Sequence, residues 1–67
     1  MTWRRYMRQR AVVNLKSGAA VEGVLYRTGS PIEVKDATVH EPGAEPAKAD
    51  GSILIDRDNV DYIQIVG

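Results

Sequence analysis

The 67-residue chain contains no cysteine and no phenylalanine, and it has a single histidine, His40. Without cysteine it forms no disulfide and no thiolate metal site, and one histidine does not build a metal site by itself. Long hydrophobic runs are also absent, since no stretch approaches the ~18–20 apolar residues that span a bilayer. The basic N-terminal segment is not followed by an apolar run, so no signal peptide is expected. We therefore expect a soluble chain that binds no metal and no membrane.

Residue patterns that support catalysis are missing too. A hydrolase needs a nucleophile and a base oriented by a third group, and we place His40 in a loop where it completes no such triad. The acidic residues in 56–61 lack the glycine and terminal glutamate of a calcium loop. Gly18 and Gly23 are not followed by the lysine of a phosphate-binding loop. We expect no enzymatic activity, no cofactor and no small-molecule substrate.

The length of the chain predicts one domain, over residues 1–67, with a thin hydrophobic core. Domains of this size are commonly stabilised by disulfides, a metal or a partner subunit. Because the composition excludes the first two, we expect a homo-oligomer.

The charge is distributed unevenly, although the formal net charge is zero. Residues 1–16 contain no acid and therefore carry a net charge of +5, from Arg4, Arg5, Arg8, Arg10 and Lys16. Residues 17–67 contain four basic and nine acidic residues, a net charge of −5. Three interpretations stay open: a solvated helix face beside an acidic domain, docking of one subunit's basic end on another subunit, or nucleic-acid binding.

The N-terminal segment predicts a short helix over residues 2–9, with Thr2 as its N-cap and apolar residues at helical spacing. Two turns are not stable alone in water, so this helix must rest on other structure. We expect Trp3 and Tyr6 to cover an open end of the domain; a stacking platform for bases is the alternative.

The rest of the chain alternates between β-branched segments and turns. We predict five strands, over residues 11–16, 20–27, 32–39, 52–55 and 60–66. Gly23 lies inside the second strand, where a glycine indicates a bulge, a bend or a close backbone approach. Residues 40–51 contain two prolines and two glycines and predict an exposed loop, which either carries function or is a tolerated insertion. The fold class is mostly β: a short helix followed by a strongly bent, five-stranded antiparallel small barrel.

Two groups of residues resemble the motifs of a known family. The first group has hydrophobic, glycine and acidic positions at Val13, Leu15, Gly18, Gly23, Leu25, Val34, Asp36 and Ala37. The second consists of Ile53-Leu54-Ile55, Asp58-Asn59-Val60 and Tyr62-Ile63. Together they cover nearly the whole chain and resemble the Sm/LSm proteins, whose small barrel is similar to SH3-like barrels. The resemblance implies an oligomeric ring that binds RNA or DNA.

The chain departs from the family at the nucleotide site. The loop at residues 26–31 is about two residues short and has no counterpart of the family's uridine-contacting asparagine. In the second motif, Asp56-Arg57 replaces the usual Arg-Gly pair, so Arg57 partly stands in for the missing arginine while Asp56 adds a negative charge. On this interpretation the nucleic-acid-binding residues are Arg4, Arg5, Arg8, Arg10, Tyr26 and Arg57.

Several phrases of the sequence, such as Asp50-Gly-Ser-Ile-Leu-Ile-Asp-Arg57, look like small, mostly uncharacterised proteins of actinobacterial tailed bacteriophages. This second resemblance implies a structural or interaction module, associated with a virion or accessory to it, in the host cytoplasm or the virion. Its partners would be other virion proteins or further copies of the chain, joined through strand edges. The residues expected at this subunit interface are Ile53, Ile55, Val60, Tyr62 and Ile63. We take this module as the first functional hypothesis and the Sm/LSm-type nucleic-acid-binding oligomer as the alternative.

Overall fold

The computed structural model describes residues 8–66 of the chain. Within this range the chain forms six strands and one short 3-10 helix: β1 (Arg10–Leu15), β2 (Ala20–Arg27), β3 (Ile32–His40), β4 (Ala47–Lys48), β5 (Ser52–Ile55), η2 (Arg57–Asn59) and β6 (Val60–Ile65). All the strand pairs are antiparallel. In this part of the chain no helix has the length and apolar character needed to cross a membrane.

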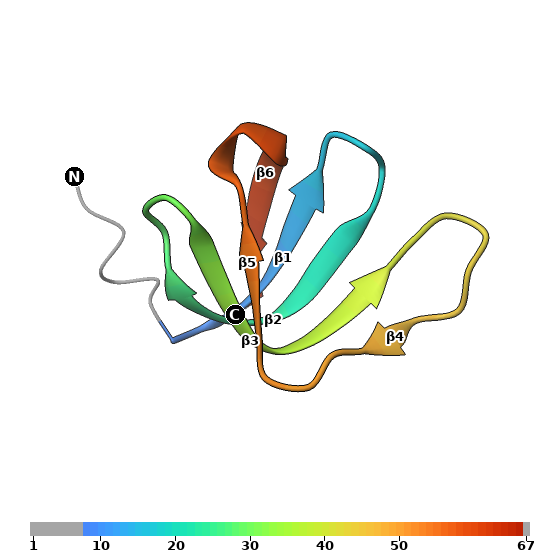
Figure 1. Ribbon diagram of the computed structural model, residues 1–67, viewed down its shortest axis with the longest axis horizontal. Coiled ribbons are helices and arrows are strands. Elements are labelled where there is room, and N and C mark those ends of the chain that lie inside the picture. Colours follow the sequence, from blue (N-terminus) through green and yellow to red (C-terminus); the bar gives the residue numbers. More distant parts are fainter. Residues whose placement is uncertain (1–7, 67) are drawn as a thin grey trace.

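The strands form one strongly curved sheet in the order β4-β3-β2-β1-β6, and β5 pairs with β3 (Figure 1). β3 pairs with β2 along one edge. Along its other edge, its first half pairs with β5 and its second half with β4, so both edges of β3 have a partner. Figure 1 shows that the curvature brings β5 and β6 to the same side of the molecule, although they are not neighbours in the sheet.

The core lies on the concave face of this sheet and follows from the alternation of the strands. Val13, Val21 and Leu25 lie at alternating, inward-facing positions, and the half-buried residues between these positions face outward. Val13, Leu25 and Val34 have no exposed surface at all, which places β1, β2 and β3 around one small core. The largest fully buried side chains in the described part of the chain are all aliphatic: Leu25, Ile32, Val13 and Val34.

The sequence prediction for Gly23 is confirmed, because the backbone of β3 approaches this residue closely. A Cβ atom at Gly23 would lie 2.6 Å from the carbonyl oxygen of Lys35. The pairing of β2 with β3 shifts register between Glu22 and Val24. Opposite, Asp36 has a positive φ of 51°, in the left-handed region. The two irregularities lie together, and they bend both strands at the same place.

The expectation of a closed barrel is wrong for the described residues, because hydrogen bonds do not close the sheet. Within residues 8–66, β5 pairs only with β3 and β6 only with β1. The connection between them explains this opening. Asp56 caps η2 by accepting a hydrogen bond from the Asp58 backbone N–H at 3.0 Å. The chain thus makes a 3-10 turn here rather than a hairpin, and β6 continues to β1.

The N-terminal helix predicted over residues 2–9 is wrong where it can be compared with the structure. Arg8 and Gln9 form a turn and a bend, and Arg8 has a φ of 62°. The Arg8 N–H donates to the Leu25 carbonyl, and the Leu25 N–H donates to the Gln9 carbonyl. These bonds extend the β1–β2 pairing, and a helix could not make them. Residues 2–7, which include Trp3, Tyr6, Arg4 and Arg5, lie outside the described residues.

The loop predicted over residues 40–51 also needs correction. His40 is the last residue of β3, and Ala47–Lys48 form β4, which pairs with Val39 and Thr38. His40 is therefore held by the sheet, and its Nε2 atom lies 3.1 Å from Oε1 of Glu22. The exposed connection is limited to residues 41–46 and to the turn before β5.

Candidate functional site

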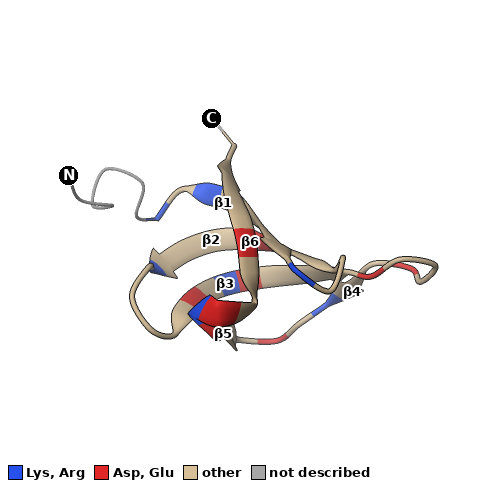
Figure 2. Ribbon diagram, turned by 90° about the horizontal axis from the view of Figure 1, so that it is seen from above, with Lys and Arg blue, Asp and Glu red and all other residues tan. Residues whose placement is uncertain are grey.

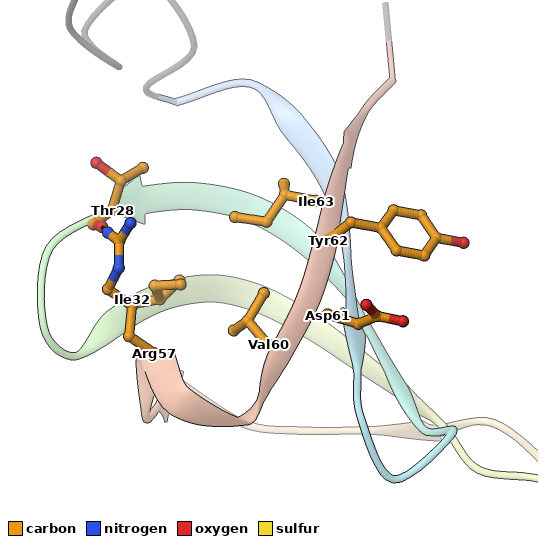
Figure 3. Close-up of a pocket in the computed structure, with 7 residues that line it drawn as sticks. All are labelled: Thr28, Ile32, Arg57, Val60, Asp61, Tyr62 and Ile63. Atoms are coloured by element: carbon orange, nitrogen blue, oxygen red, sulfur yellow. Dashed lines mark hydrogen bonds between the residues drawn. The ribbon is translucent and has the colours of Figure 1, made fainter.

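A pocket of about 400 Å³ opens on the side of the molecule where the sheet is not closed (Figure 3). Its walls are formed by strand β6, helix η2, the start of β3 and the β2–β3 loop. It is lined by Thr28, Ile32, Arg57, Val60, Asp61, Tyr62 and Ile63. The pocket therefore lies beside the unpaired edge of β6.

The floor of the pocket is apolar, and its rim is polar. Ile32, Val60 and Ile63 project into the space, whereas Tyr62 and Asp61 extend to the other side of β6 (Figure 3). Ile32 is buried, but Val60 and Ile63 are only half-buried, since no strand of the described chain covers this side of β6. The floor can thus accept an apolar side chain or the flat face of a base.

Arg57 joins the two loops that border the pocket. One guanidinium nitrogen, Nη1, donates a hydrogen bond to the carbonyl oxygen of Thr28, 29 residues away in the sequence. Within residues 8–66, the close contacts between basic and acidic side chains are Arg10–Glu22 and His40–Glu22, so Arg57 has no carboxylate partner in that range. The bond holds the guanidinium at the rim while leaving most of its five N–H donors available to a ligand.

The residues predicted for the subunit interface occupy different environments. Val60 and Ile63 lie at the floor of the pocket, and Tyr62 is 55% exposed on the opposite side of β6. Ile53 is half-buried on β5 and packs against the core. Ile55 is 6% exposed and belongs to the core, because it pairs with the buried Ile32. Val60 and Ile63 thus face the pocket, Tyr62 faces away from it, and Ile55 lies in the core.

The residues predicted for nucleic acid divide between two places. Arg57 lies at the pocket, whereas Arg8, Arg10 and Tyr26 lie where β1 begins and β2 ends. Figure 2 shows this basic end of the sheet apart from the acidic turn between β5 and β6. The remaining two, Arg4 and Arg5, lie outside the described residues. The structure thus does not bring Arg57 together with the other predicted cations.

Sequence reasoning missed two contributors. Thr28 takes part through its backbone carbonyl, which carries no sequence signal. Lys35 places its Nζ atom 4.4 Å from the centre of the Tyr26 ring, and its position next to the apolar, inward-facing Val34 in an alternating strand was the available signal. Across residues 8–66, no three histidine or acidic side chains are grouped so that they could hold a metal ion.

Comparison with known proteins identifies the fold. No protein-family model and no curated protein matches the chain. A heptameric archaeal Sm protein superimposes with a TM-score of 0.82 at 20% identity, covering 96% of this chain and 94% of that one. The Sm protein of Pyrococcus abyssii, solved with a uridine heptamer, gives a TM-score of 0.82 at 26% identity, covering 94% and 90%.

A third similar structure comes from a different kind of assembly. The NatC complex bound to CoA contains a chain that superimposes with a TM-score of 0.82 at 15% identity, covering 98% of this chain and 86% of that one. The fold of the chain is therefore Sm-like and mostly β, with an antiparallel sheet.

Proposed function

We propose that the chain is the subunit of a non-enzymatic oligomer that binds single-stranded RNA. The observation that carries this proposal is the pocket of Arg57 and Thr28, which borders an unpaired strand edge in an Sm-like fold. The likeness to an Sm protein solved with a uridine heptamer, at 26% identity, supports the choice of ligand.

Assembly follows from the two unpaired edges. β5 and β6 each offer a row of backbone donors and acceptors that no strand of residues 8–66 satisfies. Pairing β5 of one subunit with β6 of the next satisfies both rows and covers the half-buried side chains of Ile53, Val60 and Ile63. Such a contact joins different surfaces, so it produces a ring if the rotation closes. One of the similar Sm proteins is described as a heptamer.

RNA binding follows from the rim of the pocket. The Arg57 guanidinium carries donors suited to phosphate oxygens and base edges, and the apolar floor lies beside it. Asp56 and Asp58 flank Arg57 in sequence and oppose a phosphate by charge, and the family's uridine-contacting asparagine has no counterpart. We therefore expect RNA to bind with weak base selectivity.

A second candidate is a protein-interaction module, including a virion-associated one in a phage-infected cell. The free edges favour this candidate as much as the first, because they require a partner but not RNA. None of the three similar structures named above is described as a phage protein. Assembly with no RNA binding would support this candidate over the first.

The test measures native mass and RNA affinity on the full chain. We expect a mass that is a multiple of the 7.4 kDa subunit, and saturable binding of an oligouridylate at low salt. Arg57→Gln should lower the affinity about 10-fold, corresponding to one charge-assisted contact, with unchanged mass. Lys48→Gln on β4, which removes the same charge far from the pocket, should leave affinity unchanged. A monomer that binds no oligouridylate would contradict the proposal.

A further inference from the structure

The outer face of the sheet carries a row of aligned residues that the pocket does not use. Arg10 is the register partner of Val24, and Val24 is the register partner of Lys35. Cross-strand partners lie on the same face of a sheet. The buried residues of β1, β2 and β3 occupy the other face, so these three side chains point outward. Two cations thus flank an apolar residue on one outer row.

Tyr26 lies next to this row and is contacted by two cations. The Lys35 Nζ atom lies 4.4 Å from the ring centre, and the Arg8 guanidinium carbon lies 5.4 Å from it. Both distances fall within the range of cation–π attraction, which restrains flexible side chains. Because cations already occupy the ring, Tyr26 positions charge rather than offering a free surface to a base. We call Arg8, Tyr26 and Lys35 the Tyr26 cluster.

The cations of the Tyr26 cluster are not neutralised by carboxylates of the described chain. Glu22 is the nearest acid along β2, and it already faces Arg10 at 3.9 Å and His40 at 3.1 Å. Glu33 on β3 accepts a hydrogen bond from Ser52 Oγ at 3.0 Å. Neither Arg8 nor Lys35 forms an ion pair within residues 8–66. Among residues 8–66, the cluster therefore presents two exposed positive charges that form no ion pair.

The β2–β3 loop connects the cluster to the pocket. Tyr26 is only two residues before Thr28, whose carbonyl anchors Arg57 at the pocket rim. Tyr26 faces outward in the alternation of β2, whereas the pocket lies on the open inner side, so the loop forms the edge between them. A single strand bound at Arg57 would reach the cluster by passing around this loop.

We propose that the Tyr26 cluster is a second phosphate-binding surface, which holds the backbone of an RNA strand that continues outward from the pocket. This inference rests on the proposed function and adds a contact that is independent of base identity. The bases would face solvent there, because the cations contact phosphates and the tyrosine ring is occupied.

The test is the salt dependence of RNA binding by the full chain. For single strands, log K falls with log [salt] by about 0.7 per phosphate contact. The double variant Arg8→Gln/Lys35→Gln should therefore reduce the slope by about 1.4 for an oligouridylate long enough to leave the pocket. Its affinity for a very short oligouridylate should remain at the wild-type value. Lys48→Gln is the matched control for loss of charge and should not change the slope.

Two variants of Tyr26 test whether its ring positions the two cations or whether the cations bind phosphate without it. Tyr26→Phe keeps the ring and should bind the long oligouridylate as the wild type does. Tyr26→Leu removes the ring, leaves both cations, and should weaken binding two- to five-fold. Thermal unfolding of each variant checks that it is folded. Equal binding by both variants contradicts the positioning role of the ring.

The outcomes distinguish this inference from the function on which it rests. If the wild type binds RNA, Arg57→Gln weakens binding, and the double variant keeps the wild-type slope, only the Tyr26 cluster is overturned. If the wild type binds no RNA at all, both proposals are overturned. A reduced slope restricted to the long oligonucleotide supports the second surface.

Discussion

The two sides of the curved sheet differ in how completely one subunit buries them. Around β1, β2 and β3, the side chains of Val13, Leu25 and Val34 have no exposed surface. At β5 and β6, the side chains of Ile53, Val60 and Ile63, which pack against the same core, are only half-buried. Both sides are rich in aliphatic residues, so composition does not explain the difference. Strand pairing does, because the first side has neighbours on every edge and the second does not.

This difference assigns separate tasks to the two sides. The β1–β2–β3 meander is built from strands adjacent in sequence and supplies most of the core, so it carries the stability of the monomer. On the β5–β6 side, within residues 8–66, apolar side chains stay partly exposed and backbone hydrogen-bond donors stay unpaired. This side is therefore suited to bind a partner strand. The most damaging substitutions for folding should therefore lie on the first side, and those most damaging for assembly on the second.

The largest effect on stability is expected at Gly23, where β2 bends on the β1–β2–β3 side. Gly23→Val would place its Cβ 2.6 Å from a backbone oxygen, which no side-chain movement can relieve. We expect a loss of at least about 3 kcal/mol in the free energy of unfolding, measured with urea. Gly29→Ala is the matched control, since nothing lies within 4 Å of its Cβ position. Wild-type stability in Gly23→Val would disprove the close approach of the two strands.

One substitution on each side of the sheet should have a smaller effect, and the two effects should differ in kind. Leu25→Ala creates a cavity in the closed core and should cost about 2–5 kcal/mol of unfolding free energy with little effect on native mass. Ile63→Ala should cost less than Leu25→Ala in the monomer, because its side chain is only half-buried. It should instead shift the native mass toward smaller species at equal protein concentration. If Ile63→Ala left the mass unchanged while costing as much as Leu25→Ala, the comparison would fail.

The smallest effect is expected in the exposed connection between β3 and β4. Insertion of six glycine and serine residues after Ala44 doubles the length of the 41–46 segment, so it should cost about 0.6 kcal/mol. The same insertion after Ser17 should cost more, because it opens the tight turn in which the Gly18 N–H donates to the Leu15 carbonyl. Unfolding with urea measures both. Equal costs would show that the 41–46 segment is as constrained as the β1–β2 turn.

Much of the fold could be predicted from the sequence, because the alternation of residues within strands and the residue preferences of turns depend on nearby residues only. The alternation in 20–27 and the interior glycine at 23 predicted a bent strand, and Gly18, a residue type that tolerates positive φ, has a φ of 98° in the turn between β1 and β2. What failed depended on tertiary pairing. The Ala47–Lys48 strand has no strand propensity of its own and exists because β3 offers an edge. The local helical spacing before residue 10 was overridden at Arg8 and Gln9 by bonds to Leu25.

The candidate site was predictable in its residue types but not in its geometry. Arg57 was chosen because it partly stands in for the arginine of the Sm/LSm second motif, yet its link to Thr28 spans 29 residues and uses a backbone atom. Tyr26 was chosen as a nucleic-acid-binding residue, but its ring lies under Arg8 and Lys35. Both outcomes depend on which side chains share a face after folding, and that depends on register shifts at bulges, which the residues alone do not specify.

The two unpaired edges belong to different strands, and this gives any assembly built through them a direction. Each copy would pair its β5 with the β6 of the preceding copy and leave its own β6 free for the next copy. A copy whose β6 is obstructed would still be received through β5 but would stop further addition. A small fraction of such defective copies should therefore act as terminators and suppress complete assembly far beyond their share of the population.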